Sequence, residues 1–305
     1  MLALQILLLW AVAPRIDGHS TFLNRDNLMQ VARAFSFIGI AAVGATLVIV
    51  AGGIDLSVGS LIGFTDVIVA LALAAGWSVA AAAGAGLAVA TACGVANGAL
   101  VAYAGLPPFI ATLGMLSMAS GASYFISGGR IISGLPDGFT AFGQGFCFGV
   151  VPWPVVVMLT VTLAVGVLMG RSAWGRRVHA LGGGEEATRL SGIDVRRLKL
   201  SVYGSAGLLA GFAGVMYVSR FGYGSSTAGI GYELQVISAV VIGGTSLAGG
   251  EGTVAGSVLG AAVMGLLNNG LTLLNVPEEY NQFVVGLVII LAVLVDRVRH
   301  RGESR

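Results

Sequence analysis

Long apolar runs, separated by short polar stretches, dominate this chain of 305 residues. Most of these runs approach the ~20 apolar residues that a helix needs to cross a lipid bilayer. The pattern therefore predicts an all-α, polytopic membrane protein of about ten transmembrane helices. The predicted helices cover residues 1–14, 33–51, 57–76, 78–104, 108–127, 148–170, 202–221, 234–246, 253–275 and 282–297.

The composition supports this class of protein. Hydrophobic residues make up 56% of the chain and charged residues only 10%, whereas a soluble domain has roughly 25% charged residues. No polar stretch is long enough to form a soluble domain, so residues 1–305 are predicted to be a single transmembrane domain. The 48 glycines indicate close helix packing, because small residues let the backbones of membrane helices approach one another.

The basic residues predict the orientation, because Lys and Arg gather on the cytoplasmic side of membrane proteins. Residues 171–199 hold seven of the sixteen Lys and Arg residues, and residues 297–305 hold four more. Four predicted helices separate these clusters, so both fall on one side, and both termini are expected in the cytoplasm. Segment 171–200 is then cytoplasmic and 128–147 is an external loop. In this arrangement Arg15, Arg25 and Arg33 lie outside, against the rule.

Residues 52–60 interrupt an apolar region with the carboxylate of Asp55, the hydroxyls of Ser57 and Ser60, and three glycines. An ionisable group at membrane depth is costly and usually faces a protein interior or a water-filled path. Irregular backbone is tolerated there only where it is buried in protein or lines a cavity. The motif therefore indicates a transporter. A second interpretation stays open, in which Asp55 and Ser57 hold a helix break near the cytoplasmic end.

A weak internal repeat accompanies this motif. Residues 52–59 resemble residues 243–250, and each stretch is followed by an Asn-Gly pair, at 97–98 and at 269–270. The distances differ by about one helix crossing, so a simple duplication does not account for the similarity.

Segment 182–193 is the only sizeable polar element on the predicted cytoplasmic side, and it is expected to contain a short helix. Glu185 and Glu186 fall in its first turn, where negative charge favours the helix dipole. Ser191 and Gly192 follow as a stop signal.

Two features of the predicted short helix bear on whether it binds a partner. Glu185 and Arg189 are four residues apart, a favourable spacing for an ion pair. A small apolar face is formed by Ala187, Leu190 and Ile193. Two interpretations stay open at this point: a docking element for a soluble partner, or a solvated loop with a helical turn.

Taken together, these stretches resemble the membrane permease subunit of bacterial ATP-binding-cassette sugar importers of the ribose, xylose and galactose type. The matching stretches follow one another in order along nearly the whole chain. They are 52–60, 106–114, 182–193, 229–234, 241–247 and 269–270.

The resemblance implies a complex in the bacterial inner membrane. It would contain two permease subunits, identical or not, two cytoplasmic ATP-binding subunits and an extracytoplasmic sugar-binding protein. External loops 128–147 and 222–233 would receive the binding protein. The 182–193 segment looks like the coupling helix that seats in a groove of the ATPase. Its candidate coupling residues are Gly183, Glu185, Glu186, Ala187, Arg189, Leu190, Ser191 and Gly192.

A path for sugars needs hydroxyl, amide and aromatic groups rather than charge, because sugars are neutral polyols. The candidates for this path are Asp55, Ser57, Asn97, Phe109, Thr112, Asn268 and Asn269. Polar side chains of this kind also bond across membrane helices, so each has a structural alternative. Pro107 and Pro108 are interpreted as a helix start.

The chain departs from the family pattern at two positions. Gly184 stands where the family usually has Asn, and Gln235 stands where it usually has Asp. The first change alters the start of the coupling helix, and the second removes a carboxylate near the outer end of a helix.

The chain lacks the signature of an ATP-hydrolysing enzyme. Its one lysine, Lys199, is not part of the glycine-rich loop that cradles phosphates. No catalytic residue, cofactor or metal is predicted. Two other functions stay open: a permease for another small solute, such as a branched-chain amino acid or a nucleoside, and a secondary transporter driven by an ion gradient. The latter would need buried carboxylates, and Asp55 is the one candidate.

Overall fold

The computed structural model describes residues 19–277, together with 5–7, 9–10, 13, 15–16, 280, 283–284, 286–287 and 290. Helices dominate this part of the chain, which confirms the predicted all-α fold. The helices are α2 (Arg25–Val50), α3 (Val58–Ala74), α4 (Val79–Ala102), α5 (Pro108–Ser127), α6 (Asp137–Gln144), α7 (Trp153–Arg171), α8 (Ala173–Gly183), α9 (Glu185–Leu190), α10 (Val195–Phe221), α11 (Tyr232–Ile242) and α12 (Val254–Leu273). The strands are β1 (Arg15–Ile16), β2 (His19–Ser20), β3 (Phe146–Cys147) and β4 (Val151–Pro152).

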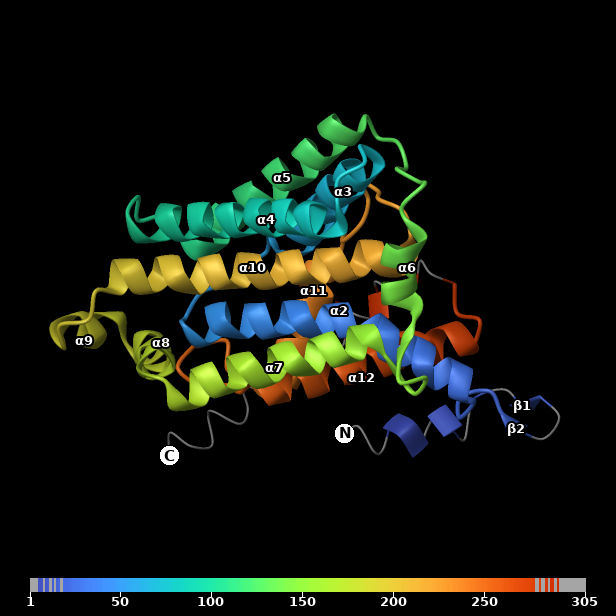
Figure 1. Ribbon diagram of the computed structural model, residues 1–305. Coiled ribbons are helices and arrows are strands. Elements are labelled where there is room, and N and C mark those ends of the chain that lie inside the picture. Colours follow the sequence, from blue (N-terminus) through green and yellow to red (C-terminus); the bar gives the residue numbers. More distant parts are fainter. Residues whose placement is uncertain are drawn as a thin grey trace.

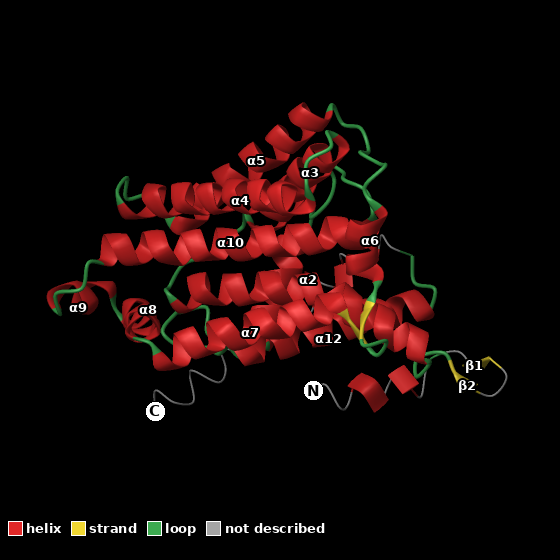
Figure 2. Ribbon diagram, in the orientation of Figure 1, coloured by secondary structure: helices red, strands yellow, loops and turns green. Residues whose placement is uncertain are grey.

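The long helices lie side by side, and their connections gather at two opposite ends of the bundle (Figure 1). One end carries α8 and α9, and the other carries α6 and the β1–β2 pair. The strands form two short antiparallel pairs, β1–β2 and β3–β4, and both lie in segments that connect helices (Figure 2). The predicted cytoplasmic segment 171–200 and the predicted external loop 128–147 therefore lie at opposite ends.

Six helices of the described chain are long and apolar enough to cross a membrane: α2, α4, α5, α7, α10 and α12. Two further apolar helices, α3 and α11, are shorter. With 11 residues, α11 is only ~16 Å long at 1.5 Å per residue. These lengths support a polytopic membrane protein.

The core is built around α10 and α2. Helix α10 packs against α4, α2 and α3, while α2 also packs against α12 and α7. Every residue of α2 from Ser36 to Val50 is buried, whereas α7 buries few of its side chains. Helix α2 is therefore central, and α7 lies on the outside of the bundle.

Helix α5 begins at Pro108 and ends at Ser127, as predicted, because Pro107 and Pro108 start it and Gly128 closes it in the left-handed conformation. The predicted starts of α2 and α10 are wrong. Helix α2 begins at Arg25 rather than at residue 33, and α10 begins at Val195 rather than at residue 202. In both, a side chain caps a polar first turn that precedes the apolar run.

Two helices were not predicted. Helix α8 lies within the predicted cytoplasmic segment, and α6 lies within the predicted external loop 128–147. The predicted helix 148–170 starts later, at Trp153, because residues 146–152 form the β3–β4 pair. The predicted helix 282–297 and most of the predicted helix 1–14 fall outside the described residues.

Candidate functional site

The 52–60 motif forms a break between α2 and α3, near the end of the bundle that carries α8 and α9. Helix α2 ends in a tight turn, in which Gly52 N–H donates to Ile49 O and Gly53 N–H donates to Val48 O, both at 2.9 Å. Gly52 has a φ of +80°, a value that glycine adopts without steric cost. The backbone then runs without helical structure to Ser57.

A buried polar cluster holds this break in place. The Asp55 carboxylate accepts hydrogen bonds from Ser57 N at 2.8 Å and from Ser57 Oγ at 2.6 Å. Asn97, on α4, donates from Nδ2 to Ser57 Oγ at 3.0 Å. Asp55 is only 4% exposed, and Ser57 and Asn97 are fully buried. The interpretation of Asp55 and Ser57 as holders of a helix break therefore agrees with the structure.

Thr112 connects the same break to α5. Its hydroxyl lies 2.9 Å from Pro108 O in its own helix and 3.2 Å from Ile54 O in the break. Four of the seven path candidates thus surround one break, and each of them is buried. A contact between any of them and a solute stays a prediction.

The other three path candidates lie elsewhere. Asn269 exchanges hydrogen bonds with Asn27 at 2.7 and 3.1 Å, which ties α12 to the first turn of α2. Asn268 donates to Gln235 on α11 at 3.3 Å. Phe109 is 48% exposed on α5. The structure therefore does not gather the seven candidates into one site.

Asp66 is a buried carboxylate that the sequence reasoning missed. It lies within α3, is fully buried, and accepts a hydrogen bond from Ser225 N at 2.6 Å. The signal was visible as a single Asp inside an apolar helix. Because Ser225 belongs to the connection between α10 and α11, Asp66 anchors that connection to α3. The same connection pairs with the 128–147 region through Ile132 and Gly224.

Replacing this anchor should lower stability. We expect Asp66→Ala to reduce the free energy of unfolding by ~1–3 kcal/mol, because Ser225 N–H loses its acceptor in a part-buried place. Asp66→Asn keeps an acceptor oxygen and should cost less. Thermal melting of the detergent-purified protein measures both. Equal melting temperatures for the two variants would contradict the anchoring role.

Helix α9 confirms the short helix predicted within 182–193, and it lies at the tip of its end of the bundle. Glu185 and Glu186 occupy its first turn. Ser191 Oγ donates to Ala187 O at 2.9 Å, and Gly192 N–H donates to Arg189 O at 3.0 Å, which closes the helix. The start and stop signals thus act as the sequence predicts.

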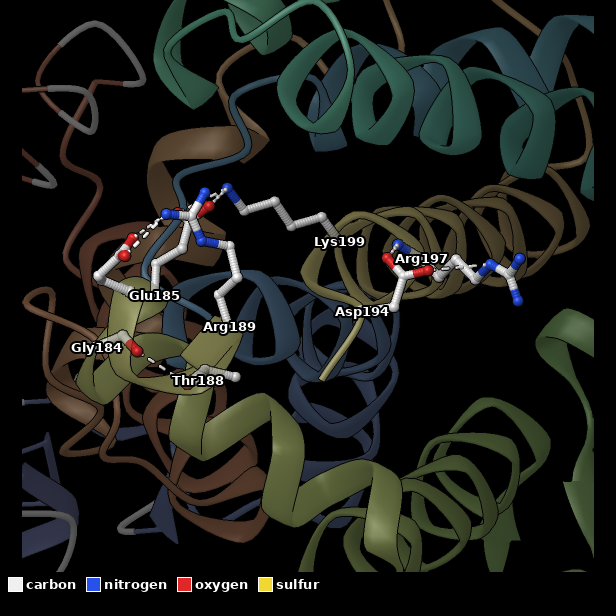
Figure 3. Close-up of polar contacts among 8 residues, drawn as sticks. Gly184, Glu185, Thr188, Arg189, Asp194, Arg197 and Lys199 are labelled. Atoms are coloured by element: carbon white, nitrogen blue, oxygen red, sulfur yellow. Dashed lines mark hydrogen bonds and ion pairs between the residues drawn. The ribbon is translucent and has the colours of Figure 1, made fainter. Parts of the chain in front are cut away.

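The predicted ion pair between Glu185 and Arg189 is wrong. Lys199, on α10, instead donates to both carboxylate oxygens of Glu185 at 2.7 and 2.8 Å (Figure 3). Arg189 pairs with Glu186 at 2.7 Å, within the same helix. The Lys199 side chain is only 18% exposed, whereas both partners of the Arg189 pair are about two-thirds exposed, at 67% and 66%. The hydrogen bond with Glu186 raises the pKa of Arg189 above its ordinary value.

The outer surface of α9 is open. Leu190 is 79% exposed and Ala187 is exposed, whereas Ile193 is half-buried and Thr188 is buried, where its hydroxyl donates to Gly184 O at 2.8 Å. The predicted apolar face is therefore present at Ala187 and Leu190 and extends only partly to Ile193. Gly183, at the end of α8, is also exposed.

A cavity of about 520 Å³ lies between α9, the α2–α3 break and the connection from α4 to α5. Its charged lining residues are Glu185, Arg189, Arg196 and Lys199. Gly52 and Gly53 also line it. The cavity thus separates the short helix from the break that Asp55 and Asn97 hold.

Comparison with known proteins assigns the chain to a family. The model of the family described as "Branched-chain amino acid transport system / permease component" matches residues 27–293. The chain belongs to this family of permeases. The permease is 42% identical to the ribose import permease protein RbsC of Escherichia coli K12, over 96% of this chain and 92% of the relative.

Two further relatives show the range of names within the family. The permease is 35% identical to the fructose import permease protein FrcC of Rhizobium meliloti, with 96% of this chain and 84% of the relative covered. It is 33% identical to the autoinducer 2 import system permease protein LsrC of Yersinia enterocolitica, with 96% and 81% covered. No solved structure matches the permease.

Proposed function

We propose that this permease is the transmembrane subunit of a bacterial ATP-binding-cassette importer and forms the path for a monosaccharide. The ribose and fructose import permeases, similar over nearly the whole chain, support the solute class. The observation that carries the mechanism is the position of α9, a short exposed helix held at one end of the bundle and opposite the 128–147 region.

The partners follow from the two ends. Cytoplasmic ATP-binding subunits would dock on α9, where Ala187 and Leu190 are exposed. An extracytoplasmic sugar-binding protein would dock on the opposite end, where residues 132 and 224 join the two predicted receiving loops. Nucleotide binding in the docked subunits would then move α9 and favour one of two arrangements of the helices.

Ten membrane crossings would place the partners as proposed. Eight of them would be helices α2, α3, α4, α5, α7, α10, α11 and α12, in alternating directions. The predicted helices 1–14 and 282–297 would add one crossing each and place both termini on the side of α9. That side carries the larger cluster of Arg and Lys, as expected for the cytoplasm of a bacterial inner-membrane protein.

The exposed face of α5 is the proposed wall of the path. Between exposed apolar side chains such as Ile110, Leu113 and Met118 it carries Phe109, an aromatic surface suited to a sugar ring, and the small or polar Gly114, Ser117 and Gly121. Small and polar groups are poor partners for lipid and good partners for a second helix or a solute. A second permease copy facing α5 would enclose this path between the two subunits. The α2–α3 break would shape the path from the side away from the second copy, and it would be held by Asp55, Ser57, Asn97 and Thr112.

Dependence on ATP tests the proposal. We expect vesicles that contain the permease, its ATP-binding subunits and the binding protein to accumulate radiolabelled ribose or fructose. They should do so only when ATP is present on the side of the membrane where the ATP-binding subunits are bound. Vesicles that lack the ATP-binding subunits should accumulate neither sugar. Uptake without them, driven by an ion gradient, would instead identify a secondary transporter. Competition by autoinducer 2 or an amino acid would point to another small solute.

A further inference from the structure

Three glycine-bearing segments from distant parts of the permease meet at one point. They are residues 50–53 at the end of α2, residues 182–183 at the end of α8, and residues 249–250 in the connection before α12. Gly250 N–H donates to Val50 O at 2.8 Å, across 200 residues of chain. We name this place the glycine junction.

Gly182 has no space for a side chain in the glycine junction. A Cβ atom there would overlap the carbonyl oxygen of Val50 and the amide nitrogen of Gly250, and it would lie 2.9 Å from the carbonyl carbon of Val50. A Cβ atom on Gly249 would lie 2.9 Å from Gly52 Cα and 3.0 Å from Gly182 O. These neighbours are backbone atoms, which cannot avoid a clash by changing rotamer as a flexible side chain can. The three segments are therefore in direct backbone contact.

The two segments that Gly182 touches follow helices that end in the same way. At the end of α2, the amides of residues 52 and 53 bond back to the carbonyls of 49 and 48. At the end of α11, the amides of residues 244 and 245 bond back to the carbonyls of 241 and 240, at 2.9 and 3.2 Å. The weak repeat between 52–59 and 243–250 thus corresponds to two equivalent helix ends. Each of these helices is followed by a non-helical connection that leads into the next helix.

Helix α9 begins three residues after Gly182, and hydrogen bonds restrain the backbone between them. Gly184 N–H donates to Ala180 O at 3.1 Å, and its carbonyl accepts from Thr188. A displacement of α9 must therefore move Gly182 or break these bonds. The 520 Å³ cavity beside Gly52 and Gly53 leaves room for such a displacement.

We infer that the glycine junction transmits the movement of α9 to both helix breaks at once, and that Gly182 positions these three segments for coupling. The inference rests on the proposed docking of ATP-binding subunits on α9. One contact then links the docking helix to the connection between α2 and α3 and to the connection between α11 and α12. Both connections would shift together as the permease opens and closes.

The test compares Gly182→Ala with Gly170→Ala in the complete importer, reconstituted in vesicles. Gly170 is the matched control, because it is exposed near the end of α7, outside the junction and α9, and a Cβ atom there meets nothing within 4 Å. We expect Gly182→Ala to assemble with the ATP-binding subunits but to move at least about fivefold less monosaccharide per ATP hydrolysed, the lower end of typical coupling effects. Gly170→Ala should behave as the unmodified importer does. Equal yields per ATP for Gly182→Ala and the unmodified importer would overturn the inference.

A second measurement needs no variant and decides the matter if Gly182→Ala does not assemble. The Gly250 amide should exchange its hydrogen at a different rate in the ATP-bound importer, because its bond to Val50 spans the junction. The Gly244 amide, bonded within its own helix end to Val241 O, is the control. Unchanged exchange at Gly250 in an importer that couples ATP to uptake would overturn the inference and leave the proposed function intact. Uptake without the ATP-binding subunits would overturn the proposed function instead.

Discussion

Gly94→Leu is expected to abolish the accumulation of folded permease in the membrane. Gly94, on α4, faces Gly207, on α10, where the two helices approach closely. A Cβ atom on Gly94 would already overlap the carbonyl oxygen of Tyr203 and lie 2.9 Å from Gly207 Cα. A leucine adds three more carbons, so we expect destabilisation above ~3 kcal/mol, at the upper end of overpacking costs. That is a large share of a typical stability of ~5–15 kcal/mol.

Gly84→Leu is the matched control for this substitution. Gly84 lies on the same helix, is exposed, and has nothing within 4 Å of the position of a Cβ atom. Size-exclusion chromatography of fluorescently tagged protein, extracted from membranes, measures both variants. We expect a monodisperse peak for Gly84→Leu and none for Gly94→Leu. Comparable peaks would show that α4 and α10 do not pack at this crossing.

The apolar runs predict which segments form long helices, and the structure shows why the ends of those helices are harder to predict. Where a helix is bounded by proline and glycine, as α5 is, both ends are readable from the sequence. Where a helix extends beyond the apolar run, as α10 does at Asp194, only the capping side chain marks its start. Hydrophobicity reports on burial in lipid or protein, whereas caps report on backbone hydrogen bonds. The two signals need not coincide.

The sequence singles out the four polar residues around the α2–α3 break, among seven candidates, but not the contacts between them. The sequence identifies Ser57, Asn97 and Thr112 as polar groups among apolar ones. It cannot show that Asn97 reaches Ser57 or that Thr112 reaches Ile54, because these pairs are 40 and 58 residues apart. The same limit explains the error at Glu185. Helix spacing predicts partners within one helix, and the partner here, Lys199, lies on the next one.

The contact between Glu185 and Lys199 leads to the last prediction. It joins α9 to α10, and α10 lies at the centre of the bundle. Glu185→Lys would place two positive charges together, so that α9 loses its fixed position relative to α10. We expect monosaccharide uptake per ATP hydrolysed to fall about tenfold, within the typical range of coupling effects. The melting temperature should change little, because a partly exposed ion pair contributes only ~0–1 kcal/mol to stability.

A double variant with the two charges exchanged distinguishes two explanations for lost coupling: loss of the Glu185–Lys199 contact, or damage to the surface on which the ATP-binding subunit docks. In Glu185→Lys combined with Lys199→Glu, the attraction is restored with the charges exchanged, and coupling should recover most of its loss. Arg197→Glu is the control, because Arg197 pairs with Asp194 inside its own helix turn and its side chain is 84% exposed. It changes the charge of the same segment without touching the bond between α9 and α10. If the double variant transports as poorly as Glu185→Lys alone, then Glu185 acts on the ATP-binding subunit directly, and α9 is not held by α10 during transport.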